Sequence, residues 1–274
     1  MKYLSIIPVA AFVLLTSCTG NKPAAEEKAN EPEIRIKEET ISYAVDSTTA
    51  KSFIAYNEAA NGKRPVVLII PEWWGLNEYV RNRARQLAAL GYVAVAVDMY
   101  GNGILADNPK DAGTLAGAFY QNPQLAKTRV EAALEHAKLP VSDAGKVAVI
   151  GYCFGGAMAL NLARMGEDIK GAVSFHGGLL GVPANKDLLK AQILVLHGED
   201  DQFVKPEEVA QFKKQMDSIG ATYTFKSYAG ATHAFTNPDA TENGKKFSIP
   251  IAYNAAADTA SFKEMEIFLD KIFK

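Results

Sequence analysis

The residue of this sequence best placed to act as a nucleophile is Cys153, which lies in the stretch GYCFGG, residues 151–156. The form G-x-C-x-G is typical of a sharp, strained turn between a strand and a helix, where glycines let the helix approach the strand. Such a turn exposes the nucleophile, and the amide of the next residue, Phe154, faces the oxygen of an attacked carbonyl. The motif predicts acyl transfer by a thiol. A buried cysteine in a turn without function is the alternative.

A thiol nucleophile of this kind needs a base and an acid that orients the base, in the chain order nucleophile, acid, histidine. Asp201 follows the apolar run QILVLHG, and His233 lies in AGATHAFTNP, after the next predicted strand. The order and the positions at strand ends both match. We expect Cys153, Asp201 and His233 to come together, with Asp200 as the alternative acid.

A second carboxylate, Glu72, ends another apolar run. In VVLIIPEWWGLNEY, five apolar residues lead through a proline to Glu72 and then to Trp73 and Trp74. A charge at the end of a buried strand is costly unless it has a role or a partner. Glu72 is therefore a candidate functional residue.

The elements that must position these residues alternate along the chain. Apolar runs without polar alternation, typical of strands covered on both faces, lie at 65–70, 92–98, 146–152, 171–177, 192–198 and 222–228. Helical patterns lie between or after them at roughly 76–90, 123–138, 156–166, 206–219 and 256–273. Residues 33–45 and 51–57 indicate an antiparallel hairpin. This order predicts an α/β fold, with a mostly parallel central sheet and helices on both faces.

In such a sheet, ligands bind beyond the carboxyl ends of the strands. The chemically capable residues that leave the predicted strands are Glu72, Trp73, Asp98, Cys153, Phe154, His176, Glu199, Asp200, Asp201 and His233. A nucleophile, carboxylates and histidines therefore fall at one edge of the sheet.

With these residues in place, the chain resembles the dienelactone hydrolase family of α/β-hydrolases. The resemblance spans about residue 33 to the C-terminus and rests on PEWWGLN, GYCFGG, HGEDDQFV and GATHAF. It implies that Cys153 is the nucleophile, His233 the general base and later acid, and Asp201 the residue that orients the histidine. Asp201 is favoured over Asp200 because the family's acid is followed by a short x-x-V run, here residues 202–204.

The resemblance also assigns residues around the nucleophile. It implies that Glu72 bonds the resting thiol and takes its proton when substrate binds, and that the Trp73 amide joins that of Phe154 as an oxyanion donor. The rings of Trp73 and Trp74 either line the substrate pocket or pack beneath the loop. We expect Trp74, Tyr152 and Asn237 at the pocket.

The sequence departs from the family pattern where the substrate's carboxylate is bound. The namesake enzyme uses two arginines, but the matching stretches here, GNGILADNPKD and HAFTNPD, contain none, and Asn237 stands near the second place. Asparagine cannot replace the charge and fork of arginine. We therefore expect hydrolysis of a neutral ester, lactone or thioester in place of dienelactone.

Other residues give weaker signals. His176 and His197 fit turns in which an imidazole bonds to backbone, with direct involvement as the alternative, and His136 is expected in solvent on a helix. No metal-ligand spacing and no phosphate-loop or dinucleotide motif occurs, so we expect neither metal nor cofactor.

The N-terminus predicts export. Lys2 precedes the apolar run YLSIIPVAAFVLL, too short to span a membrane, and Leu15–Cys18 resembles a bacterial lipobox. We expect a signal peptide at 1–17, a flexible tether at 18–32 lipidated on Cys18, and one hydrolase domain at 33–274, facing the periplasm as a monomer. The alternative is an ordinary signal with a chance cysteine.

Composition narrows the function classes further. The formal net charge is -2, and no basic block offers a nucleic-acid surface. The partners expected are a small ester or lactone and, through the lipid alone, a membrane. A ligand-binding protein that keeps the fold without catalysis is the rival hypothesis, and a redox-sensing thiol lacks a resolving cysteine once Cys18 carries lipid.

Overall fold

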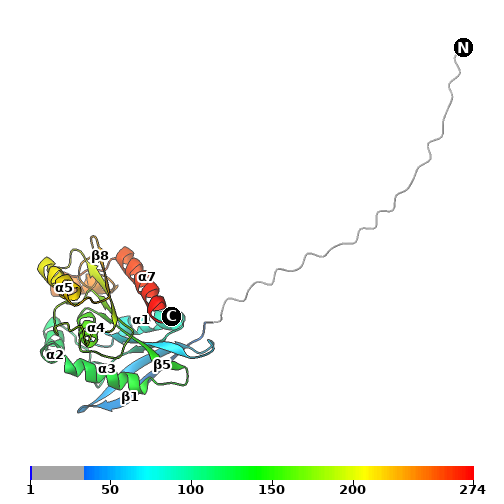
Figure 1. Cartoon of the computed structure of the whole chain (residues 1–274), viewed down its shortest axis with the longest axis horizontal. Helices are drawn as coiled ribbons and strands as arrows, with labels where there is room; N and C mark the ends of the chain where they lie inside the picture. Colours follow the sequence, from blue (N-terminus) through cyan, green and yellow to red (C-terminus); the bar gives the residue numbers. More distant parts are fainter. Residues whose placement is uncertain (2–33) are drawn as a thin grey trace. The chain divides into compact units, whose positions relative to one another are not determined.

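The structure is a computed structural model that describes Met1 and residues 34–274 (Figure 1). The predicted signal peptide, Cys18 and the tether lie outside the described residues. Residues 34–274 belong to one compact unit. Within the described part, no helix is both long and apolar enough to cross a membrane.

A single sheet of eight strands organises this unit. Its spatial order is β1-β2-β4-β3-β5-β6-β7-β8, with β1 antiparallel to β2, β2 antiparallel to β4, and every later pair parallel. The strands are β1 (Ile36–Val45), β2 (Thr48–Asn57), β3 (Arg64–Ile70), β4 (Val93–Ala96), β5 (Ser142–Tyr152), β6 (Gly171–Phe175), β7 (Gln192–Gly198) and β8 (Tyr223–Tyr228). The expected mostly parallel sheet with an N-terminal antiparallel hairpin is confirmed.

Seven helices of the described residues accompany the sheet. They are α1 (Glu78–Ala89), α2 (Pro109–Gln121), α3 (Gln124–His136), α4 (Phe154–Arg164), α5 (Pro206–Ser218), α6 (Ala240–Phe247) and α7 (Ala255–Ile272). Side chains from α2, α3, α4 and α5 build one apolar cluster with the sheet, and those from α1 and α7 build another. Helices therefore cover both faces, as predicted.

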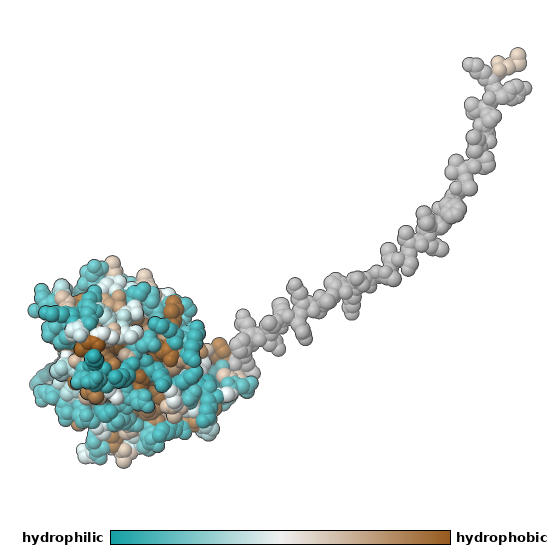
Figure 2. All heavy atoms as spheres, in the orientation of Figure 1, coloured by the Kyte–Doolittle hydropathy of each residue, from teal (hydrophilic) through white to brown (hydrophobic). Residues whose placement is uncertain are grey.

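Strand β3 shows how the sequence divides between the two layers. Val66, Leu68 and Ile70 belong to the first cluster, whereas Val67 and Ile69 belong to the second. Successive side chains of a strand point to opposite faces, so a strand covered on both faces must be apolar throughout. Hydrophilic residues dominate the surface seen in Figure 2.

The sequence analysis missed α2 and α6. Helix α2 contains Gly113 and Gly117, which weaken a helical pattern, and begins with an Asn108 cap whose side chain accepts from the Asp111 amide. Helix α6 has only 8 residues, mostly polar, with Gly244 among them. Residues of α2 itself, and the segment that follows α6, contact the site described next.

Candidate active site

Cys153 lies on a strained turn between β5 and α4. Its backbone has φ 53° and ψ −115°, a conformation that L-residues rarely adopt. The flanking glycines permit it: a Cβ on Gly151 would lie 2.0 Å from the Gly155 carbonyl oxygen, and one on Gly155 would lie 2.2 Å from that of Ile70. Helix α4 can therefore start directly against β3 and β5, as the G-x-C-x-G pattern indicates.

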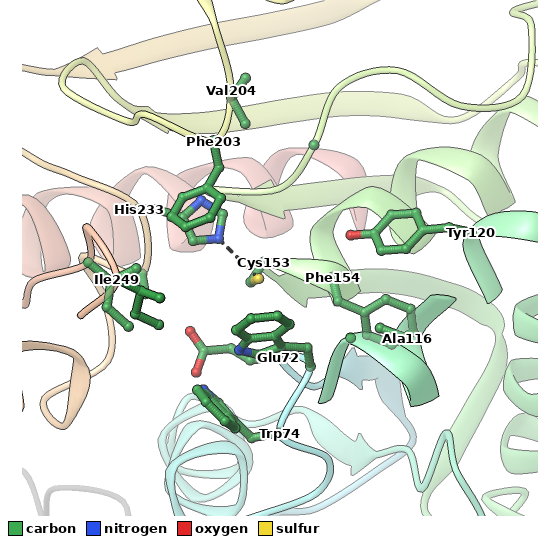
Figure 3. Close-up of a pocket in the computed structure, with 15 residues that line it drawn as sticks. Glu72, Trp74, Ala116, Tyr120, Cys153, Phe154, Phe203, Val204, His233 and Ile249 are labelled. Carbon is green, nitrogen blue, oxygen red and sulfur yellow. Dashed lines mark hydrogen bonds between the residues drawn. The ribbon is translucent and has the colours of Figure 1, made fainter. Parts of the chain in front are cut away.

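The three residues expected to act together do meet. His233 Nε2 lies 3.0 Å from Cys153 Sγ (Figure 3), and His233 Nδ1 lies 2.8 Å from Asp201 Oδ2. The other oxygen of Asp201 accepts the amides of Phe203 and Val204 at 2.8 and 3.2 Å. Both oxygens of this carboxylate are thus fixed by the turn after β7.

Asp200, the alternative acid, points elsewhere. Its side chain is exposed, and its backbone amide bonds to the carbonyl of Ala231. Asp201 is only 6 % exposed. The geometry therefore places Asp201, and not its neighbour, beside the histidine.

The environment of His233 favours its protonated form. Burial lowers the pKa of His233, but the charge on Cys153 and the hydrogen bond to Asp201 outweigh burial, and the pKa is raised well above its usual range. A protonated imidazole at this position can stabilise a thiolate on Cys153 and can donate a proton to a leaving group.

Glu72 lies in the wall of the same cavity and is 2 % exposed. Asn237 Nδ2 donates to its Oε2 at 2.6 Å, whereas Oε1 has no hydrogen-bond partner among the described residues. Burial raises the pKa of Glu72 to about 7, against the opposing effects of the Asn237 hydrogen bond and of charge on His233. The expected hydrogen bond from the resting thiol to Glu72 is not formed, because Cys153 Sγ is hydrogen-bonded to His233 instead.

The cavity has a volume of about 290 Å³. Among the described residues that line it, none is an arginine or lysine, which agrees with the missing carboxylate clamp. Apolar side chains make most of its wall. The lining residues are Glu72, Trp73, Trp74, Gly113, Ala116, Tyr120, Cys153, Phe154, Gly178, Phe203, Val204, His233, Ala234, Ile249 and Ile251 (Figure 3).

Trp73 and Trp74 both line the cavity and also pack. Their rings meet edge to face at 5.1 Å, and Trp74 stacks on Phe247 of α6 at 5.7 Å. The backbone amides of Trp73 and Phe154 donate no hydrogen bond to a protein acceptor in the described chain. Both amides thus remain available to a substrate oxygen.

Two residues expected at the pocket do not line it. Tyr152 is fully buried, and its ring stacks on Phe175 at 4.6 Å within the cluster on the α1 and α7 side of the sheet. This follows from the alternation of side chains along β5. Asn237 is 2 % exposed and lies behind Glu72, which it holds.

The remaining histidines take different places. His176 accepts the Cys153 amide at Nδ1, so the predicted contact with backbone is confirmed there. His197 lies beside Phe225, and its Nδ1 has no partner among the described residues, so the expected backbone contact is not seen at that atom. His136 is exposed, as expected, and its Nδ1 lies 2.9 Å from the Ala132 carbonyl oxygen.

The sequence analysis missed several wall residues. Tyr120 comes from α2, its ring meets Phe154 edge to face at 5.7 Å, and its hydroxyl points into the cavity (Figure 3). Ile249 and Ile251 follow α6. The sequence alone could not place Tyr120, Ile249 and Ile251 at the cavity, because helices α2 and α6 were not recognised. In the described chain, no group of three histidine, cysteine or acidic residues could hold a metal ion.

The sheet order, the strained cysteine turn and the Cys–His–Asp contacts together define an α/β-hydrolase fold with the geometry of a nucleophilic site. The model of the dienelactone hydrolase family matches residues 51–273, and the chain belongs to this family. It is a hydrolase of that family.

Individual relatives agree. A protein named "Putative carboxymethylenebutenolidase" from Aquifex aeolicus is 33% identical over 179 residues, which are 63% of this chain and 77% of that protein. One of the same name from Salmonella typhimurium is 27% identical over 242 residues, covering 80% and 87%. A dienelactone hydrolase-like promiscuous phosphotriesterase, P91, from metagenomic libraries has a solved structure with a TM-score of 0.81 and 32% identity, covering 87% of this chain and 99% of that one.

Proposed function

We propose that the protein hydrolyses neutral carboxylic esters or lactones through a thioester on Cys153. The observation that carries this proposal is the continuous contact from Cys153 Sγ through His233 to Asp201 at the wall of an apolar cavity. A histidine within hydrogen-bond reach of a thiol, and oriented by a carboxylate, is the arrangement that activates a nucleophile.

The reaction follows from these positions. The thiol gives up its proton, and Cys153 Sγ bonds to the ester carbonyl carbon, whose oxygen accepts the amides of Trp73 and Phe154. His233 protonates the alcohol oxygen as its bond to carbon breaks, which leaves a thioester. Water then loses a proton to His233 and attacks the thioester, the acid leaves as product, and the departing thiolate of Cys153 takes its proton back from Glu72.

Glu72 is the proposed acceptor of the thiol proton. Its unpartnered Oε1 and a pKa of about 7 make it a base able to change protonation state near neutral pH. Asn237 fixes the other oxygen without supplying a charge. A small movement of the thiol away from His233 and toward Glu72 is the step required before attack.

The wall of the cavity selects a neutral, apolar substrate. Trp73, Trp74, Phe154 and Ile251 offer packing surface, and the described residues that line the cavity include no arginine or lysine to bind a substrate carboxylate. Above pH 7, ionised Glu72 would repel one. Ring-bearing or short aliphatic acyl groups fit the volume of about 290 Å³.

A neutral phosphotriester is a second candidate substrate. The similar structure named a promiscuous phosphotriesterase shares 32% identity with this chain. Thiolate attack on a neutral phosphorus centre needs the same nucleophile and no carboxylate clamp. Phosphotriesters therefore belong beside esters in the first substrate panel.

We also propose that the protein is exported, lipid-anchored on Cys18 and monomeric. The lipobox-like Leu15–Cys18 and the polar stretch that follows it support the anchor. Replacing Cys18 with serine should release the protein from membranes, and continued attachment would contradict the anchor. Sedimentation of the domain starting near residue 34 would check the monomer.

The experiment for the proposed function measures release of p-nitrophenol from a series of esters, ring opening of simple lactones, and hydrolysis of a p-nitrophenyl phosphotriester. The Cys153→Ala variant is the control. Turnover that requires Cys153 supports the hydrolase. A folded protein that binds panel members without turnover would instead favour the ligand-binding hypothesis.

A further inference from the structure

A buried chain of polar side chains lies behind the nucleophile turn. The Cys153 amide donates to His176 Nδ1 at 3.1 Å, His176 Nε2 lies 2.7 Å from Thr236 Oγ1, and that hydroxyl lies 2.7 Å from the Tyr79 hydroxyl. His176 is 1 % exposed, Thr236 0 % and Tyr79 7 %. The chain thus joins β5, β6, α1 and the loop after His233.

The direction of these hydrogen bonds determines the form of His176. A backbone amide can only donate, so Nδ1 must be the acceptor, and the neutral ring then carries its proton on Nε2 and donates to Thr236. Burial, which is the largest effect, and the charges of His233 and Arg83 lower the pKa of His176 well below its usual range. The ring is therefore neutral, with one tautomer selected by its two neighbours.

The hydrogen bond between the Cys153 amide and His176 joins two strained parts of the backbone. Cys153 has φ 53° and His176 has φ 41°, so both residues of this pair adopt left-handed backbone. The Cys153 amide is shared between His176 Nδ1 and the Phe175 carbonyl oxygen at 3.0 Å. Thr236 is held in turn, because Arg83 Nη2 donates to its carbonyl at 2.6 Å. Strained backbone persists where surrounding contacts over-determine it.

We propose that His176 is a positioning residue whose Nε2-protonated ring, held by Thr236, fixes the Cys153 amide and thereby the orientation of the nucleophile. His176 does not line the cavity, and its ring centroid lies 5.3 Å from that of His233. It acts through Cys153 and touches no substrate. This inference rests on the proposed thiol chemistry.

Thr236→Val tests the proposal without touching Cys153 or His176. Valine keeps the shape but cannot accept from Nε2, so the Nε2–H is left unpaired and the ring is no longer held in the orientation that accepts the Cys153 amide. We expect kcat for a panel ester to fall about tenfold or more, with KM changed less than about twofold. Thr236→Ser should restore kcat, because it restores the hydroxyl.

A matched control is Ser142→Ala, at the other end of β5. Ser142 is also buried and its hydroxyl makes two hydrogen bonds, to Ala137 and from Leu139. Its loss should lower stability without changing kcat. An equal fall in kcat in both variants would mean that any buried hydroxyl matters, and would overturn the positioning role.

Two readouts separate this proposal from the proposed function. Histidine ¹⁵N NMR of the intact protein should show His176 neutral and protonated on Nε2, and Thr236→Val should shift the ring ¹⁵N resonances of His176, because the Nε2–H loses its acceptor. Alkylation of Cys153 by iodoacetamide should slow several-fold in Thr236→Val, because the thiol is no longer aligned with His233. If no ester is hydrolysed, the proposed function fails while these readouts still decide the role of His176. A wild-type Nδ1-protonated ring, or unchanged alkylation in Thr236→Val, would overturn it.

Discussion

Asn237 holds the buried carboxylate of Glu72 through a single hydrogen bond of 2.6 Å to Oε2, and it brings no charge. The family resemblance places near this position an arginine that would bind the substrate's carboxylate. Asparagine adds no positive charge of its own, and burial raises the pKa of Glu72 to about 7, against the opposing effects of the Asn237 hydrogen bond and of the charges of His233 and Arg83. The replacement of arginine by asparagine therefore affects both the charge of the substrate that can bind and the pH at which Glu72 ionises.

Glu72→Gln should slow formation of the thioester by removing the proposed proton acceptor. We expect a loss of about 10²-fold or more in the single-turnover acylation rate, in the range typical of a lost general base. The acidic limb of kcat/KM near pH 7 should also disappear. Full activity, or an unchanged limb, would show that Glu72 is not the base.

The same variant should stabilise the fold at neutral and higher pH. The folded-state pKa of Glu72, about 7, exceeds the ordinary value of 4.5. The unfolded chain therefore releases this proton first, and stability falls as pH rises from 4.5 to 7. The full effect corresponds to roughly 3 kcal/mol. Urea unfolding should give Glu72→Gln a larger free energy of unfolding than the wild type at pH 8. At pH 4.5 the variant should show no such advantage.

Asn237→Leu should shift the acidic limb to higher pH. Its amide favours the ionised form of Glu72, so removing it raises that pKa further. We expect the limb of kcat/KM to move up by about one pH unit, with activity at high pH largely retained. An acidic limb of kcat/KM at the same pH as in the wild type would show that the hydrogen bond from Asn237 does not affect the pKa of Glu72.

Asp201→Asn should cost far more activity than Asp200→Asn. Asp201 binds His233 and two backbone amides, whereas Asp200 is exposed. We expect at least about 10²-fold loss of kcat for the first and less than about twofold for the second. Equal losses would contradict the geometry of the acid.

Trp73 in the cavity wall should limit the size of the acyl group that the enzyme accepts. Trp73→Ala enlarges the cavity beside Cys153 while leaving the backbone amide in place. The ratio of kcat/KM for a long-chain to a short-chain p-nitrophenyl ester should rise about tenfold, a discrimination typical of a few methylenes in an apolar pocket. The short ester is the internal control, and an unchanged ratio would place the acyl group elsewhere.

The sequence predicted the sheet edge well because strand ends can be located from apolar runs. Cys153, Asp201 and His233 each follow such a run, and parallel strands bring their carboxyl ends together. Glu72 was placed at the same edge for the same reason. Local patterns were therefore sufficient for the residues that the sheet itself positions.

The positions of the other site residues depend on tertiary packing, which a local sequence pattern does not reveal. Tyr120 reaches the cavity from a helix weakened by glycines, and Asn237 turns behind Glu72 because of the loop that follows His233. Tyr152 could have been placed correctly, since it precedes Cys153 on a strand and points to the other face. His176 showed its contact with Cys153 only once β5 and β6 were paired.

The most direct test of the central claim is rapid-quench mass spectrometry during turnover of a panel ester. The account predicts a transient mass increase equal to the acyl group, located on the peptide that contains Cys153 and absent in Cys153→Ala, together with loss of turnover in that variant. Turnover that survives in Cys153→Ala, or an acyl group found on another residue, would contradict it.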